Sequence, residues 1–179
     1  MFQELEELGK NRYNSKSELL KILKEESRKI SIYDQMKVVN ELKESLNSVQ
    51  KQYRKDFFKT YAKGFVIRIN TIKDENLEKY SNDEFDIDEY IKSIIILKRQ
   101  YEEDNENKTN SKEFKTIYTI ISLYTTFILE EPIHEIGTKF PGNLEIIYKN
   151  GKYYCPVKKN NEDNPKAVCQ FCIAENLDY

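Results

Sequence analysis

The stretch EEPIHEIGTKFPGN, residues 130–143, divides the sequence into two parts with different local preferences. All four prolines lie at or beyond Pro132, and only two of the five glycines come before it. Proline interrupts helices and glycine favours turns, so the residues before this stretch can be helical almost throughout. The sequence therefore predicts a helical part, residues 1–131, and a smaller turn-rich part, residues 132–179, packed together as one structural unit.

Upstream of the dividing stretch, apolar residues recur every three or four positions in five successive segments, which is the spacing of one face of an α-helix. The five stripes are Leu19, Ile22, Leu23 and Ile30; Met36, Val39, Leu42, Leu46 and Val49; Tyr53, Phe57, Tyr61, Phe65 and Ile72; Ile87, Tyr90, Ile91, Ile94, Ile95 and Tyr101; and Phe114, Ile117, Tyr118, Ile121, Tyr124 and Ile128. Polar links separate them. We therefore predict a mainly α fold, an antiparallel bundle of about five helices.

Helix start signals support these segments. Ser15, followed three residues later by Glu18, has the pattern of a capping box, and Ser31 or Asp34 is the expected cap of the second helix. Residues 65–72, FVIRINTI, alternate in polarity and are rich in β-branched side chains. A strand is therefore the alternative for that one segment.

Downstream of the dividing stretch, residues 144–157, LEIIYKNGKYYCPV, carry a hairpin signal. The dipeptide Asn150-Gly151 lies between two β-prone runs, and both residues tolerate the positive φ angles of a two-residue turn. Such a turn places Cys155 opposite Ile146. We therefore predict a small C-terminal β-hairpin module beside the helices.

The composition limits the classes of partner. Charged residues make up 34% of the chain and nearly cancel to a net charge of −2, whereas non-specific nucleic-acid binding needs a positive excess. The first residues lack the apolar segment of a signal peptide, and the most apolar run, residues 116–129, is too short to cross a bilayer. We expect a cytoplasmic protein without membrane contact.

A basic and aromatic group of residues in the C-terminal part keeps single-stranded nucleic acid open as an alternative partner. Its members are Lys152, Lys158, Lys159, Lys166, Tyr153 and Tyr154. The simpler interpretation is a solvated hairpin face with aromatic packing beneath it, and the acidic balance of the chain favours that interpretation.

All four side chains that bind soft metal ions lie in the last quarter of the chain: His134, Cys155, Cys169 and Cys172. Three thiolates and one imidazole form a tetrahedral zinc set, and the two-residue gap in Cys169-Gln-Phe-Cys172 lets both sulfurs reach one ion. An odd number of cysteines in a chain without a secretion signal argues against a disulfide framework. We therefore predict a zinc site in the hairpin module, with an iron–sulfur cluster as the alternative cofactor.

The fourth ligand is inferred and not part of a motif. His134 is the first candidate, and Glu162, Asp163 and Glu175 are the substitutes. A redox dithiol is another interpretation of the Cys-x-x-Cys spacing, although the sequence shows no βαβ unit of the thioredoxin kind. Inert buried thiols are the simplest interpretation.

Four motifs resemble an uncharacterised protein family of methanogenic archaea, domain of unknown function 2115: KISIYDQMK, GTKFPGN, GKYYCPVK and AVCQFCIAE. The resemblance covers most of the chain. Lys139 and Asn143 depart from it, because family members often have Pro and Gly there. The matching positions are His134, Gly137, Thr138, Phe140, Pro141, Gly142, Cys155, Pro156, Cys169 and Cys172. The resemblance implies an archaeal cytoplasmic setting, in which iron–sulfur chemistry is common, and it implies no substrate.

These observations support three functional hypotheses. The first is a non-enzymatic protein whose closed structural metal site fixes a surface for a protein partner, since four protein ligands leave no open coordination position. The second is an iron–sulfur or dithiol redox protein. The third is a metal-dependent enzyme in which His134 acts as an acid or base beside Glu135.

Overall fold

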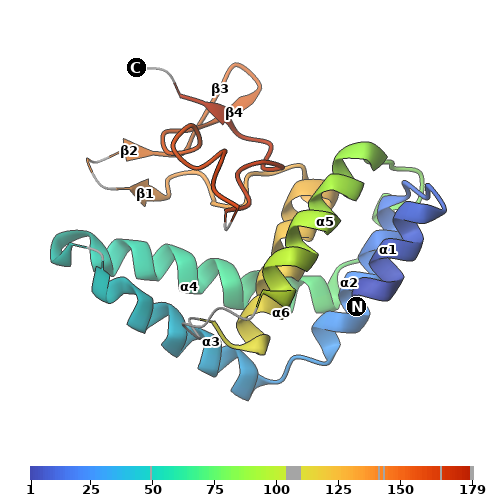
Figure 1. The fold of residues 1–179 in the computed structure, drawn as a ribbon, viewed down its shortest axis with the longest axis horizontal. Coiled ribbons are helices and arrows are strands. Elements are labelled where there is room, and N and C mark those ends of the chain that lie inside the picture. Colours follow the sequence, from blue (N-terminus) through green and yellow to red (C-terminus); the bar gives the residue numbers. More distant parts are fainter. Residues whose placement is uncertain (49, 104–109, 141, 143, 166, 178–179) are drawn as a thin grey trace.

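The computed structural model describes residues 1–48, 50–103, 110–140, 142, 144–165 and 167–177. These residues form a mainly helical fold with short strands near the C-terminus (Figure 1). The α-helices are α1 (Phe2–Lys10), α2 (Lys16–Arg28), α3 (Ile32–Ser45), α4 (Lys51–Asp74), α5 (Ile87–Glu102) and α6 (Lys112–Leu123). Two 3₁₀ turns, η1 (Leu46–Ser48) and η2 (Leu77–Tyr80), and a π-helical segment, η3 (Tyr124–Leu129), complete the helical part.

The five predicted helical segments correspond to α2 through α6, and α1 is a sixth helix that the sequence analysis did not predict. Residues 65–72 lie inside α4, so the helix and not the alternative strand forms there. Burial of Phe65, Ile69 and Ile72 explains the choice, because their spacing of four and three residues fits one helix face. The side chains of Tyr53, Phe57 and Tyr61, like residue Val49, lie outside the described part of the chain.

Of the two caps considered for the second helix, Ser31 or Asp34, the structure has Ser31 at the N-cap, whereas the predicted capping box at Ser15 is only partly formed. The Ser31 hydroxyl accepts a hydrogen bond from the Asp34 amide, and the Asp34 carboxylate accepts one from the Ser31 amide, which is a complete capping box. Ser15 occupies the N-cap position of α2, but its side chain makes no capping hydrogen bond. Its hydroxyl lies 2.9 Å from that of Ser17 instead.

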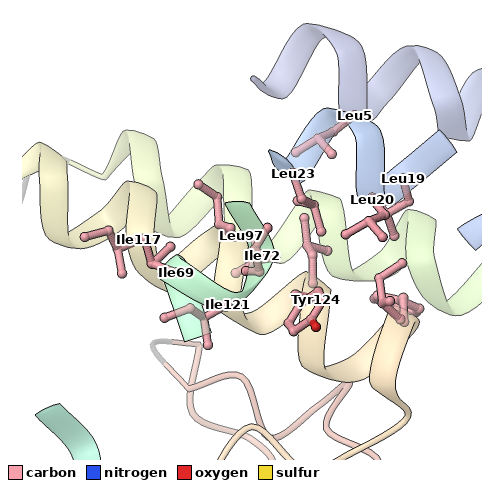
Figure 2. Packing of buried hydrophobic residues seen from close by; sticks show 14 of the residues in the cluster. Leu5, Leu19, Leu20, Leu23, Ile69, Ile72, Leu97, Ile117, Ile121 and Tyr124 are labelled. Carbon is pink, nitrogen blue, oxygen red and sulfur yellow. The ribbon is translucent and has the colours of Figure 1, made fainter. Parts of the chain in front are cut away.

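The main hydrophobic core lies where α2, α4, α5 and α6 meet, and α1 covers one end of it (Figure 2). Its fully buried residues include Leu5, Leu19, Leu20, Leu23, Ile69, Ile72, Leu97, Ile117 and Tyr124. From the C-terminal part, Val168 and Phe171 also pack into this core. The tail is therefore anchored on the helices by apolar contacts that need no metal ion.

The helices are not all aligned as in a simple antiparallel bundle. In Figure 1, α3 and α4 form a helical hairpin, whereas α5 and α6 lie across α4 at a steep angle. No helix in the described part of the chain is both long and apolar enough to cross a membrane.

The C-terminal part folds over α4 and beside α5 as two small sheets (Figure 1). The strands are β1 (Lys139–Phe140), β2 (Leu144–Glu145), β3 (Ile147–Lys149), β4 (Lys152–Cys155) and β5 (Glu175–Asn176). The predicted hairpin is confirmed: β3 pairs with β4 in antiparallel register, with Tyr148 opposite Tyr153. The β5 strand adds to β4 in parallel. A second, small hydrophobic cluster supports this part and consists of Phe140, Ile146, Cys155 and Ala174.

Candidate functional site

The β3–β4 hairpin positions the first cysteine of the candidate site. Asn150 and Gly151 adopt φ angles of 54° and 79°, the left-handed region that a two-residue hairpin turn requires. The β4 strand then ends at Cys155, which is buried beside Ile146 as the predicted register implies. Pro156 has no amide hydrogen for a further ladder bond, so the strand stops where the thiol is presented.

The loop after β4 turns two backbone amides toward the Cys155 sulfur. Burial raises the pKa of the Cys155 thiol, and hydrogen bonds from the amides of Val157 and Lys158 partly oppose this effect. The nearby charge of Cys172 raises the same pKa further. Amides that donate to a sulfur stabilise its thiolate, so this loop suits a cysteine that loses its proton to a metal ion.

The other two cysteines lie on a tight turn at residues 168–172. The amides of Phe171 and Cys172 donate to the Val168 carbonyl at 3.3 and 3.1 Å. Burial raises the pKa of Cys169 to about 11, and the charges of Cys172 and Cys155 raise it too. The three thiols therefore lie close enough to interact electrostatically. Burial and the neighbouring thiols thus both oppose ionisation of Cys155 and Cys169.

Lys158 supplies positive charge to this cysteine cluster, which we define as Cys155, Cys169 and Cys172. Its Nζ donates hydrogen bonds to the carbonyls of Cys172 at 2.9 Å and Ala174 at 2.7 Å. Its charge lowers the pKa values of Cys155 and Cys169. Lys158 thus ties the hairpin loop to the tail and favours thiolates nearby.

Two oxygen-bearing side chains border the cluster. The charge of the Glu162 carboxylate raises the pKa of Cys169, and its Oε1 accepts a 3.0 Å hydrogen bond from Asn176. Asn176 lies opposite Cys155 in the parallel β4–β5 pairing. Its Oδ1 is buried and has no hydrogen-bond partner among the described residues. A buried oxygen without a donor is destabilising, and this one belongs to the residue paired with Cys155.

As the side chains stand, no group of three or more His, Cys, Asp and Glu residues in the described ranges is arranged to hold a metal ion. Binding one would require the thiol side chains to close in on it. Three mutually repelling thiolates do so only when a cation replaces their protons.

His134, the predicted fourth ligand, lies in a different setting. It lines a cavity of about 30 Å³ with Arg68, Phe65 and Tyr118, and its ring packs edge-on against Phe140 with centroids 5.6 Å apart. Burial lowers the pKa of His134 to about 4, and the charge of Arg68 lowers it as well. The structure therefore brings the three cysteines together and places the imidazole of His134 beside Arg68. The role of His134 as a metal ligand stays a prediction.

The other two substitute ligands are Glu175 and Asp163. Glu175 pairs with Lys152 at 2.6 Å, and Asp163 is exposed. Because Lys152 and Lys158 both bond within the module, two of the four lysines considered for nucleic acid already have protein partners. Lys166 lies outside the described residues.

Sequence reasoning missed Arg68 and Asn176. Arg68 is the one charged residue within the apolar segment 65–72, and that position is a usable signal. The structure buries it to 7% exposure, with loose ion pairs to Glu131 at 3.6 Å and Glu135 at 3.5 Å. Asn176 had no comparable signal, because only the parallel β4–β5 pairing brings it to the cysteines.

Comparison with known proteins gives one consistent result. Residues 15–177 match the family model described as an uncharacterized protein conserved in archaea, DUF2115. A UPF0305 protein of Methanothermobacter thermautotrophicus is 32% identical over 88% of this chain and 93% of its own. A UPF0305 protein of Methanococcus maripaludis is 33% identical over 87% of this chain and 93% of its own. One of Methanocaldococcus jannaschii is 29% identical over 90% of this chain and 96% of its own. No solved structure matches the chain.

Proposed function

The chain belongs to the DUF2115 family of uncharacterised archaeal proteins, and from that premise we propose a function on the basis of its own side chains. Cys155, Cys169 and Cys172 bind a zinc ion that fastens the C-terminal module. The surface that this ion fixes then binds a protein partner. The protein is not an enzyme in this proposal.

The effect of neighbouring thiols on the pKa values of Cys155 and Cys169 is the observation that carries the proposal. The charge of Cys172 raises the pKa of both Cys155 and Cys169, although 13 residues lie between Cys155 and Cys169 in the sequence. Two amide donors and the Lys158 charge act on the Cys155 thiol, and the residue with the unpartnered oxygen, Asn176, pairs with Cys155 in the sheet. Inert buried thiols need none of these features. Bound zinc would replace the thiol protons and crosslink the hairpin end to the tail.

Two candidates for the fourth ligand, Glu162 and His134, have different surroundings in the structure. Glu162 already interacts with Cys169 and would only have to exchange its contact with Asn176. His134 would have to bind the ion within reach of the Arg68 charge, which opposes a dication. The geometry therefore supports Glu162, and His134 remains the candidate that the sequence favours.

Metal analysis of anaerobically purified protein tests the proposal. We expect a stoichiometric amount of zinc and a colourless preparation. Serine variants of Cys155, Cys169 or Cys172 should each lose the zinc. A brown preparation that contains iron and sulfide would show that the cysteines hold an iron–sulfur cluster and not zinc. A folded wild-type protein without metal would overturn the proposal.

The fourth ligand is tested with matched variants. Glu162→Gln should weaken zinc binding at least about tenfold, because loss of a ligand removes a bond and a charge. The control is Asp163→Asn, which removes the same charge from the neighbouring exposed residue. Zinc loss in His134→Gln, with full retention in Glu162→Gln, would assign the imidazole instead.

The enzymatic hypothesis has less support from the geometry. A general base at neutral pH works best with a pKa near 7, whereas burial lowers that of His134 to about 4. The exposed aromatic Tyr148, whose ring lies tilted against that of Tyr153 on the hairpin, gives the module a surface feature typical of protein contacts. A partner captured by the wild type but not by the zinc-free serine variants would support the interaction role.

A further inference from the structure

Positive charge in this acidic chain is concentrated on one helix. The chain has a net charge of −2, yet α4 contains seven basic residues and two acidic ones, a net charge of +5. The net charge of every other α-helix lies between −2 and +1. The part of the chain outside α4 therefore carries −7, and the near-neutral composition conceals a basic surface. Such a charge asymmetry is typical of a site for an anionic partner.

Three exposed lysines form a row along the first half of α4. Lys51, Lys55 and Lys59 recur every four residues, so they lie on one side of the helix about 6 Å apart along its axis. We call these three residues the lysine row. Within the described part of the chain, none of them has an ion pair or a side-chain hydrogen bond. Their ammonium groups are therefore available to a partner.

The lysine row opposes the stability of its own helix. Like charges four residues apart repel each other, and the positive N-terminal end of the helix dipole disfavours cations in the first turn. Lys51 lies in that turn of α4, which contains no acidic residue. In contrast, α5 has Asp88 and Glu89 in its first turn and Arg99 in its last, which is the stabilising arrangement. A face that served only solubility would mix both signs, so the row points to a role other than stability.

The first half of α4 is open to a large partner. In Figure 1, α4 begins at the far end of the α3–α4 hairpin, away from α5 and α6. Of the side chains described between Leu46 and Phe65, none is buried and no large apolar one is exposed. Helices that bind membrane surfaces insert exposed apolar side chains into the lipid. The lysine row therefore fits a polyanion in solution better than it fits a membrane.

We propose that the lysine row binds the phosphate backbone of a nucleic acid. Evenly spaced cations along a straight helix match a strand whose charges also repeat at even intervals, whereas acidic patches on proteins have no fixed repeat. Lysines that pair with phosphates release counterions and fix position without reading bases, so binding is independent of sequence. The negative charge outside α4 keeps other surfaces of the chain away from the same strand. This role is independent of what the cysteines bind.

Fluorescence anisotropy of labelled nucleic acids with the whole chain as purified tests this surface. The probes are a short DNA duplex, an RNA duplex and a single strand of the same sequence. We expect at least one of them to bind, with an affinity that falls as salt is raised by a log–log slope of about −3, since each phosphate contact contributes about −0.9. Polyglutamate and phosphatidylserine vesicles represent an acidic protein and a membrane. Tighter binding of either than of every nucleic acid, or no nucleic-acid binding at low salt, overturns the proposal.

A triple variant locates the binding surface. Lys51→Gln, Lys55→Gln and Lys59→Gln together should weaken binding of the tightest nucleic acid at least about tenfold and should remove most of the salt dependence. The same variant should unfold at the same temperature as the wild type or a higher one, because repulsion within α4 is relieved. Lost binding in a protein of undiminished stability then reports a lost contact and not a lost fold.

A matched control removes the same charge elsewhere. Lys21, Lys139 and Lys149 are also exposed, lie on other elements, and have no ion pair in the described ranges. Their triple glutamine variant, Lys21→Gln, Lys139→Gln and Lys149→Gln, has the same net charge as the variant of the lysine row. It should keep the wild-type affinity within about twofold, because only contacts at the phosphates determine binding. Equal weakening by both triple variants, or wild-type affinity in the variant of the row, contradicts the proposal.

Discussion

The imidazole of His134 makes a pH-dependent contribution to folding. Its pKa is about 4 in the folded chain, against about 6.5 when unfolded. Between these values only the unfolded chain binds the proton, so the free energy of unfolding decreases as pH falls from 6.5 toward 4. The contribution is complete above pH 6.5. Because the ring is partly exposed, we expect a loss of about 1–3 kcal/mol.

Urea denaturation of wild type and His134→Gln across this pH range measures the effect. Carboxylates also titrate there, so the difference between the two proteins is the relevant quantity. The variant should lose less stability on acidification than the wild type does. Parallel curves would show that the imidazole is as accessible to protons in the folded chain as in the unfolded one.

For single residues, the sequence indicated which side chains could form a site but not which neighbours surround each of them. The cysteines were identifiable because three thiols so close in sequence have few roles, and the structure brings them together. The setting of His134 could not be read in this way. It depends on Phe140 beside the ring and on Arg68 from α4, a helix about 60 residues earlier in the sequence. No local pattern encodes that contact.

Among the secondary-structure elements, α2 and α3 offer a matched test of capping. Ser31 makes both hydrogen bonds of a capping box, whereas Ser15 occupies the same position without one. Ser31→Ala should therefore lower the free energy of unfolding by about 1 kcal/mol, and Ser15→Ala by clearly less. Urea denaturation at neutral pH measures both. Equal losses would mean that the Ser31 box contributes nothing beyond its position.

Local sequence signals explain which elements could be foreseen. The hairpin was specified by Asn150 and Gly151, because few dipeptides accept two positive φ angles. The α1 helix was missed since its nine residues bury only Leu5, Leu8 and Gly9. The π-helical segment η3 was missed as well, because apolar spacing does not distinguish it from a continuation of α6.

For the molecule as a whole, the two hydrophobic clusters differ in how much structure they can support alone. The main core draws on all six helices, whereas the described core of the C-terminal part has four buried residues. A cluster that small rarely holds a fold without a crosslink or a metal ion. Apolar docking through Val168 and Phe171 supplies one anchor, and the proposed zinc site would supply the second.

Removal of zinc should therefore loosen residues 132–179 and spare the helices. Hydrogen exchange, with and without a chelator, measures this region by region. We expect faster exchange in β3, β4 and the 156–168 loop, with little change in α2, α4 and α6 or in far-ultraviolet circular dichroism. Phe171→Ala gives the complementary case, because it removes the apolar anchor but no ligand: the module should loosen while zinc is retained. Unchanged exchange after complete zinc removal would mean that apolar docking alone holds the module, and the cysteine cluster would then need a role other than fastening it.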